Sequence, residues 1–124
     1  MYLDTHVLVW LYAGEIDRFP QRGQKLLEGE PLLVSPMAIL ELEYLYEIQR
    51  ITVAPSQIIE YLESAINLAV CPISFHRVIM EACDLNWTRD PFDRLIVGQA
   101  IAAGQLILTK DERIHAQTDL AVWH

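Results

Sequence analysis

T-R-D-P-F-D-R-L-I-V-G-Q-A, residues 88–100, places two aspartates three positions apart around a proline and then continues as an apolar helical pattern. Asp90 is expected at the N-cap, Pro91 at the first helical position and Asp93 in the first turn, where a carboxylate meets unpaired backbone N–H groups. A helix needs only one such cap, however, and Asp93 continues along an apolar row through Val97. Both acids are compatible with a structural role, but an acid on a buried row needs a partner, which the rest of the chain must supply.

Strand and helix patterns alternate along the rest of the chain, without repeats, linkers or low-complexity segments. The sequence predicts strands at residues 1–3, 32–34, 69–73, 106–109 and 120–123, with the last at an edge of the sheet. It predicts helices at residues 6–12, 20–28, 36–50, 56–68, 75–85, 90–103 and 111–116. Such alternation is typical of a mainly parallel α/β sheet covered by helices on both faces. We therefore expect a single domain over residues 1–124.

Composition limits the class of protein. The chain has 124 residues, 52% of them hydrophobic, which is enough for a real core and excludes general disorder. The apolar runs are too short to span a membrane, and the first residues, M-Y-L-D, lack the features of a signal peptide. We therefore expect a cytoplasmic protein without a membrane partner. Cys71 and Cys83 lack zinc-ligand spacing and are interpreted as reduced core residues.

The formal charge of -8, from 17 acids and nine bases, argues against a generic nucleic-acid coat protein. The bases are unevenly spread, because four of them flank the acids of the C-terminal third: Arg89, Arg94, Lys110 and Arg113. This placement is compatible with phosphate binding and equally with solvated helix faces.

Two further acids follow predicted strands. Open parallel sheets place their sites beyond the carboxyl ends of the strands, where the strand order reverses. Asp4 ends the first strand, and Asp111 follows Thr109 at the end of the fourth. Each acid, taken alone, is also a reasonable cap for the helix that it precedes.

Glu41 is harder to explain as a structural residue. Helical winding of residues 37–51 places Glu43, Glu47 and Arg50 together on the expected solvent face. Glu41 falls instead in the apolar stripe that is expected to pack against the sheet, made of Met37, Leu40, Tyr44, Leu45 and Ile48. A buried carboxylate must be protonated, paired with a base or bound to a cation. No lysine or arginine is close in sequence.

If the strand-end and helix-face acids converge, their repulsion requires a counter-ion. The acids in question are Asp4, Glu41, Asp93 and Asp111. Ligation by carboxylate oxygens alone suits Mg²⁺ or Mn²⁺ rather than zinc. Such an ion can bind a phosphate oxygen and lower the pKa of an attacking water, so phosphodiester hydrolysis is the natural chemistry.

Other polar residues could assist this chemistry. Arg94 and Lys110 could hold the backbone of the substrate. Thr5, Ser35 and Thr109 sit beside the acids and could hydrogen-bond a carboxylate or a ligated water, although they would serve equally well as caps. His6 follows Asp4 closely and could touch substrate, but a histidine in a first helical turn is more often incidental.

Four segments together resemble the PIN-domain ribonucleases, specifically the toxin components of VapBC-type toxin-antitoxin pairs. They are L-D-T-H-V-L-V-W-L at residues 3–11, S-P-M-A-I-L-E-L at 35–42, R-D-P-F-D-R-L-I-V-G-Q-A at 89–100 and I-L-T-K-D-E at 107–112. The resemblance covers nearly the whole chain. It implies metal-binding catalytic acids at Asp4, Glu41, Asp93 and Asp111, with Asp90 as a helix cap and supporting group. It also implies a parallel sheet between helices, Mg²⁺ or Mn²⁺ dependence, endonucleolytic cleavage of RNA, dimerisation and inhibition by a cognate antitoxin.

The chain departs from that pattern in two ways. Related toxins often carry a histidine where this chain has Thr88. The net acidity is also unusual for a protein that binds single-stranded RNA, which normally approaches through basic grooves and aromatic platforms. A structured RNA loop, recognised locally, is easier to reconcile with this charge than broad RNA binding.

The apolar side chains of the helix at residues 36–50 outnumber those that one packed stripe requires. Ile39, Leu42 and Tyr46, beside Leu45, predict an additional covered surface. A second copy of the chain or an antitoxin segment could cover it.

Other classes of protein were weighed against the nuclease interpretation. A phosphoacceptor receiver domain would need paired acids after the first strand, where this chain has Asp4 alone, and an acid near Ser74. A haloacid-dehalogenase-type phosphatase would need D-x-D where the sequence has D-T-H. A binding module with purely structural acids remains open on the sequence alone.

Overall fold

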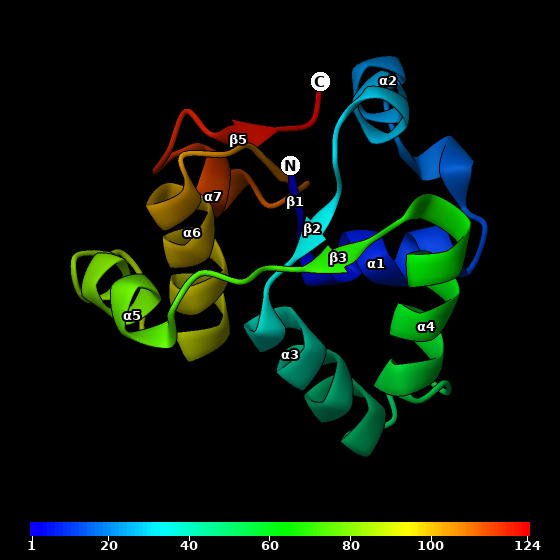
Figure 1. Ribbon diagram of the computed structural model, residues 1–124, viewed down its shortest axis with the longest axis horizontal. Coiled ribbons are helices and arrows are strands. Elements are labelled where there is room, and N and C mark those ends of the chain that lie inside the picture. The colour runs from blue at the N-terminus through cyan, green and yellow to red at the C-terminus, as the bar shows by residue number, and fades with distance from the viewer.

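The computed structural model describes residues 1–124 and contains one sheet of five short parallel strands with helices around it (Figure 1). The strands are β1 (Tyr2–Leu3), β2 (Leu33–Val34), β3 (Ala69–Val70), β4 (Ile107–Leu108) and β5 (Ala121–Val122). Their spatial order is β3-β2-β1-β4-β5, and every neighbouring pair is parallel. The expected parallel α/β fold and the edge position of the last strand are confirmed, although the strand predicted at 69–73 already ends at Val70.

Seven α-helices and one short 3₁₀ helix connect the strands. They are α1 (Thr5–Tyr12), η1 (Ile16–Arg18), α2 (Gln21–Gly29), α3 (Pro36–Glu47), α4 (Pro55–Ile66), α5 (Phe75–Cys83), α6 (Pro91–Ala103) and α7 (Glu112–His115). All seven α-helices match predicted segments, and only η1 was not foreseen. None of them is long and apolar enough to cross a lipid bilayer.

The polar residues that precede the helices act as N-caps, as expected from the sequence. Asp4, Ser35, Asp90 and Asp111 each accept a hydrogen bond from a backbone N–H group in the first turn of the following helix. Such bonds satisfy donors that have no partner within the helix. At the other end of α6, Gly104 adopts a left-handed conformation (φ 62°), which glycine reaches without a steric penalty.

The core is formed by the central strands and the helices that cover them. Tyr2, Leu3, Ile107 and Leu108 of β1 and β4 have at most 1% of their surface exposed. They belong to one continuous cluster of 21 buried hydrophobic residues. Strands β1 and β4 each pair with a strand on both sides, so the polar residues at their carboxyl ends follow fully paired, buried strands.

Helix α6, which begins with the opening motif, packs closely against α5. A Cβ atom at Gly98 would lie 3.2 Å from the backbone nitrogen of Ala82 and 3.3 Å from the carbonyl oxygen of Val78. The absence of a side chain at Gly98 therefore permits the close approach of the two helices. Asp93 and Val97 lie on a buried face of α6, with exposed fractions of 9% and 1%, as the apolar row predicted.

The predicted orientation of α3 is wrong. The stripe that was expected to pack against the sheet is largely exposed, because Leu40, Tyr44 and Ile48 have exposed fractions of 54%, 47% and 46%. The buried row is instead Ala38 and Leu42, so Leu42 belongs to the core and not to an additional surface. Helix α3 is packed against α1, α4 and α6 rather than laid flat on the sheet, and these neighbours select its buried side.

The two cysteines differ in environment. Both are free, and Cys71 is buried as expected, whereas Cys83 is exposed at the end of α5. The prediction that both are core residues is therefore wrong for Cys83, which is exposed although its neighbour Ala82 is buried against α6.

Candidate active site

The four predicted acids line one cleft at the carboxyl ends of β1 and β4. The cleft has a volume of about 370 Å³, and we call it the acidic cleft. Its carboxylates are Asp4, Glu41, Asp90, Asp93 and Asp111, and its cations are Arg50 and Arg113. In the sheet, β1 lies between β2 and β4, so the chain order of the strands reverses at β1. The cleft lies at this point of reversal.

Asp4 is the most rigidly held acid of the cleft. Its side chain is almost fully buried, with 6% of the residue exposed. Oδ1 accepts a hydrogen bond from the Thr5 backbone N–H at 2.8 Å, and Oδ2 accepts one from the Thr109 hydroxyl at 2.7 Å. Asp4 is therefore both the cap of α1 and a fixed carboxylate at the base of the cleft.

Thr109 connects two of the acids. Besides donating to Asp4, its fully buried hydroxyl accepts a hydrogen bond from the backbone N–H of Asp111 at 3.0 Å. One side chain at the end of β4 thus positions both the Asp4 carboxylate and the turn that carries Asp111. A valine of the same shape could make neither bond.

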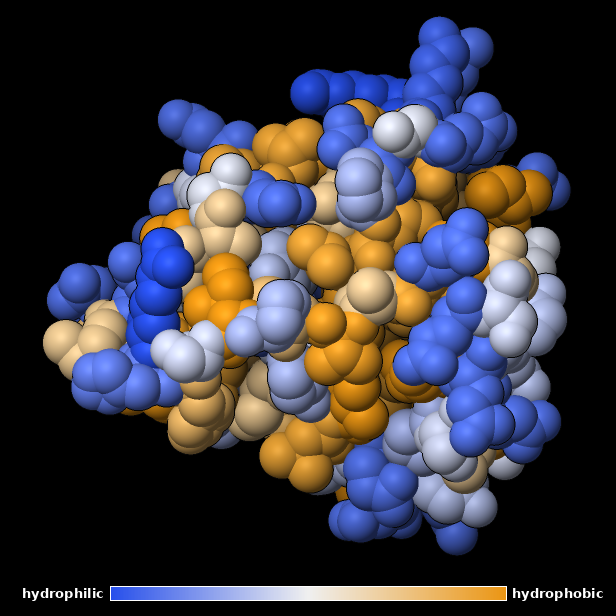
Figure 2. Space-filling view, viewed as in Figure 1, coloured by the Kyte–Doolittle hydropathy of each residue, from blue (hydrophilic) through white to orange (hydrophobic).

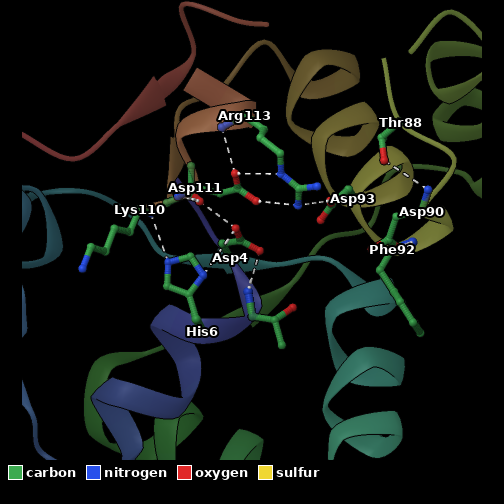
Figure 3. Close-up of polar contacts among 11 residues, drawn as sticks. Asp4, His6, Thr88, Asp90, Phe92, Asp93, Lys110, Asp111 and Arg113 are labelled. Atoms are coloured by element: carbon green, nitrogen blue, oxygen red, sulfur yellow. Dashed lines mark hydrogen bonds and ion pairs between the residues drawn. The ribbon is translucent and has the colours of Figure 1, made fainter. Parts of the chain in front are cut away.

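His6 belongs to the site, although its position in a first helical turn was judged to be more often incidental. Its Nε2 accepts a hydrogen bond from the Lys110 backbone N–H at 3.0 Å, and its Nδ1 lies 3.6 Å from Asp4 Oδ2 (Figure 3). In the neutral ring the proton therefore belongs on Nδ1, facing Asp4. Burial lowers the pKa of His6 and outweighs the opposing effect of the Asp4 charge.

Asp93 and Asp111 share one cation. Arg113 Nη2 lies 3.4 Å from Asp93 Oδ2 and 3.2 Å from Asp111 Oδ2. Burial alone would raise the pKa of Asp111, but the hydrogen bonds and the charge of Arg113 hold it below the ordinary value. Arg113 follows Asp111 by two residues, so the turn that presents the acid also presents its partner.

Glu41 and Asp93 ionise with difficulty in this cleft. Burial and the neighbouring carboxylates Asp4, Asp93 and Asp90 raise the pKa of Glu41 to about 7. The Thr5 hydroxyl lies close enough to Glu41 to oppose this rise in the pKa of Glu41, but it makes no hydrogen bond of normal geometry. Burial and the carboxylates Asp90, Asp4 and Asp111 raise the pKa of Asp93 to about 6. The cleft therefore holds carboxylates that its two arginines do not relieve of mutual repulsion.

The raised pKa of Glu41 predicts a pH-dependent effect on stability. Because the folded value of about 7 lies above the ordinary 4.5, the folded protein binds more protons than the unfolded chain between these values. The contribution of Glu41 to stability therefore falls as the pH rises through this window. In metal-free buffer, we expect Glu41→Gln to gain stability relative to wild type between pH 5 and pH 8, by about 1 kcal/mol after allowance for solvent screening.

Urea unfolding of the two proteins at several pH values measures this difference. The comparison between variants cancels the opposing titration of His6, which is the same in both proteins. A difference that stays constant or shrinks as the pH rises would contradict the assignment of Glu41 to a crowded, partly buried carboxylate cluster.

The donor set fits a hard divalent cation. The cleft offers carboxylate oxygens with raised pKa values, and the Thr5 hydroxyl is buried (3% exposed) beside them without a hydrogen-bond partner. Oxygen ligands of this kind suit Mg²⁺ or Mn²⁺. No three His, Cys, Asp or Glu side chains are yet close enough to hold an ion together. Side-chain movement within the cleft would therefore have to accompany binding.

Two of the predicted supporting or substrate-binding residues, Ser35 and Arg94, make contacts outside the acidic cleft, whereas Asp90 is the helix cap that was predicted. Ser35 Oγ accepts a hydrogen bond from the Met37 backbone N–H at 3.1 Å, and Ser35 does not line the acidic cleft. Arg94 donates to the carbonyl oxygens of Ala82 and Cys83 at 3.1 and 3.2 Å, outside the cleft. Asp90 lines the cleft but is exposed and caps α6 through the Phe92 backbone N–H at 2.9 Å.

Lys110 lies at the rim of the site and not within the acidic cleft. It lines an adjoining hollow together with His6, Trp10 and Asp111, and its Nζ lies 6.0 Å from the centre of the Trp10 ring. This hollow opens beside the cleft, so Lys110 can reach a ligand that extends out of it. Trp10 is half-buried between these polar groups, and its ring forms an edge contact with His6 at 4.8 Å.

Arg50 and Trp10 were not predicted in the site, and Arg113 was predicted only as one of four bases that could bind phosphate. For Arg113 a signal was present, since it follows Asp111 by two residues in a segment already notable for its acid. Arg50 had no such signal. It was placed on the solvent face of a helix that in fact ends at Glu47, and the chain beyond that end turns back toward the cleft.

Sequence comparisons place the chain in a known family. The model of the PIN domain family matches residues 1–120. Ribonuclease VapC22 of Mycobacterium tuberculosis is 29% identical over 118 residues, which cover 92% of this chain and 88% of that protein.

Solved structures show the same fold at low sequence identity. VapBC2 from Rickettsia felis, bound to a DNA fragment from its promoter, matches with a TM-score of 0.70 and 16% identity over 99% of this chain and 98% of the other. A toxin-antitoxin complex from Klebsiella pneumoniae gives 0.64 and 16% over 98% and 94%. DNA-bound VapBC from Salmonella typhimurium gives 0.62 and 18% over 97% and 92%. With a family model that spans nearly its whole length and a fold shared with these structures, the chain belongs to the PIN domain family.

Proposed function

We propose that the protein is a divalent-metal-dependent endoribonuclease that acts as the toxin of a toxin-antitoxin pair. The observation that carries the proposal is the convergence of carboxylates from separate parts of the chain on one cleft, with Glu41 and Asp93 ionising only with difficulty. A bound cation would relieve this repulsion. The match to a ribonuclease from Mycobacterium tuberculosis and the structural likeness to toxin-antitoxin complexes support the same activity.

The residues divide the chemistry among them. Asp4, Glu41, Asp93 and Asp111 would hold Mg²⁺ or Mn²⁺, which supplies charge neutralisation at the phosphate and a water of lowered pKa. The Thr109 hydroxyl hydrogen-bonds both the Asp4 carboxylate and the Asp111 backbone N–H, and so fixes the position of the two acids relative to each other. His6, neutral and fixed by the Lys110 N–H, orients a proton toward Asp4, and the unpartnered Thr5 hydroxyl can hydrogen-bond a water or a carboxylate in the cleft.

The substrate is RNA that is recognised locally. The net charge of -8 disfavours extended contact with a polyanion. The cations at the cleft and its adjoining hollow, Arg50, Lys110 and Arg113, are few but close to the acids. A short stretch of backbone, such as that of a structured loop, matches a cation set of this size better than a long single strand.

Protein partners are a cognate antitoxin and a second copy of the chain. Hydrophobic side chains gather on the face of the molecule that carries α3 (Figure 2). Leu40, Tyr44, Phe75 and Met80 are 47% to 70% exposed, and apolar surfaces of this kind commonly mark protein interfaces. The exposed surface thus supports at least one protein partner.

The direct test is incubation of the purified protein with a panel of structured and unstructured RNAs in Mg²⁺, Mn²⁺ or EDTA. We expect internal cleavage of selected RNAs with either ion and none in EDTA, because without the ion the carboxylates of the cleft repel the phosphate and no water of lowered pKa is supplied. Asp93→Asn, prepared in parallel, controls for contaminating nucleases. Equal cleavage by this variant, or cleavage that persists in EDTA, would refute the proposed mechanism.

A further inference from the structure

Arg113 is the only lysine or arginine whose side chain forms an ion pair with a carboxylate of the acidic cleft. Its Nη2 atom lies between Asp93 Oδ2 at 3.4 Å and Asp111 Oδ2 at 3.2 Å (Figure 3). A single nitrogen therefore joins a carboxylate on α6 to one at the start of α7. A metal ion bound to both oxygens would have to occupy the same space, because any cation that touches both must lie between them.

The contacts of Arg113 are also easily broken. Its side chain is 69% exposed, and its distances to the two carboxylates are longer than the roughly 2.7–2.9 Å of strong charge-assisted hydrogen bonds. Arg94 differs, because its guanidinium donates to two backbone carbonyl oxygens on the far side of α6. The side chain of Arg113 is thus held only by long hydrogen bonds and ion pairs to Asp93 and Asp111, and because it is exposed it can leave without disturbing the packing of the core.

We propose that Arg113 is the resident counter-ion of the acidic cleft, that a divalent ion displaces its guanidinium, and that the displaced guanidinium then binds a phosphate oxygen of the RNA. This inference rests on the proposed nuclease function. A doubly charged ion neutralises Asp93 and Asp111 better than one shared guanidinium, and the two cations repel each other at this separation. Arg113 remains tethered beside the cleft by α7, where its planar fork suits a phosphate.

Calorimetric titration with Mn²⁺ tests the displacement. If Arg113 occupies the site in about nine of ten metal-free molecules, Arg113→Gln should bind Mn²⁺ about tenfold more tightly, since apparent affinity scales with the fraction of open sites. Arg50→Gln is the matched control, because it removes a charge from the same cleft without breaking an ion pair; its Mn²⁺ affinity should change much less. Equal affinities of wild type and Arg113→Gln would overturn the inference while leaving the nuclease proposal intact. Absence of Mn²⁺ binding in every protein would overturn both.

Two further measurements complete the test. At saturating Mn²⁺, Arg113→Gln should show a raised KM for RNA, so that the variant binds the metal more tightly and the RNA more weakly than wild type. An unchanged KM would refute the phosphate contact. In wild-type protein, Mg²⁺ should shift the NMR signal of the Arg113 Nε–H group and leave that of Arg94 in place. This second measurement needs no variant to fold, and an Arg113 signal that does not respond would overturn the displacement.

Discussion

Glu41→Gln is expected to lower the rate of RNA cleavage by at least about 100-fold, because a catalytic metal ion contributes several kcal/mol of transition-state stabilisation. The substitution keeps the shape of the side chain and removes one negative charge from the wall of the cleft. Since Glu41 resists ionisation in the metal-free protein, with a pKa of about 7, the same change should not weaken the fold. Loss of activity together with unchanged or greater stability is the signature of a ligand and not of a structural acid.

The measurement is kcat/KM for a cleaved RNA, beside urea unfolding of the same preparations in EDTA. Glu47→Gln is the matched control, because Glu47 is an exposed glutamate near the end of the same helix and lies outside the cleft. It should retain wild-type cleavage. If Glu41→Gln cleaves RNA as fast as this control, the protein is better described as a binding module whose acids are structural.

Leu42→Ala should destabilise the protein by about 2–5 kcal/mol, the usual cost of removing a buried leucine side chain and leaving a cavity. Leu42 has none of its surface exposed and belongs to the main hydrophobic cluster. Leu40→Ala, two residues earlier on α3, is expected to change the free energy of unfolding by no more than about 0.5 kcal/mol, because Leu40 is 54% exposed. Helix propensity cannot explain the contrast, since both substitutions replace leucine by alanine.

Urea denaturation of the two variants, analysed with a common m-value, gives the comparison. It distinguishes the observed orientation of α3 from the one that winding of the sequence predicted, in which Leu40 faced the sheet. A larger loss of stability for Leu40→Ala than for Leu42→Ala would show that the helix is rotated relative to the structure described above.

The acids of the cleft could be predicted from sequence because each stands at the end of a strand or on a helix row with apolar neighbours. Asp93 lies on a buried row of α6, and Asp4 and Asp111 follow strands of a parallel sheet, whose carboxyl ends form a common edge. Glu41 was chosen because it interrupts an apolar stripe. That stripe proved to be exposed, so the reason was partly wrong, although Glu41 does line the acidic cleft.

The supporting contacts were predicted less well, because they depend on side-chain directions. Thr109 bridges Asp4 and the Asp111 backbone, as its position at a strand end suggested. Ser35 occupies an equivalent position after β2, yet its hydroxyl is used by the first turn of α3. Arg94 follows Asp93 directly and for that reason projects from a different side of α6, toward α5.

The sequence by itself determined the order of strands and helices, the caps that begin the helices and the family to which the chain is similar. These features depend on local interactions, which involve residues a few positions apart: hydrogen bonds from a cap to the next turn, and the period of the apolar positions. Only the tertiary structure decided which face of α3 is buried and which cation pairs with Asp93. Both outcomes arise from contacts between segments that are distant in the chain. Such contacts outweigh the pattern within any single helix.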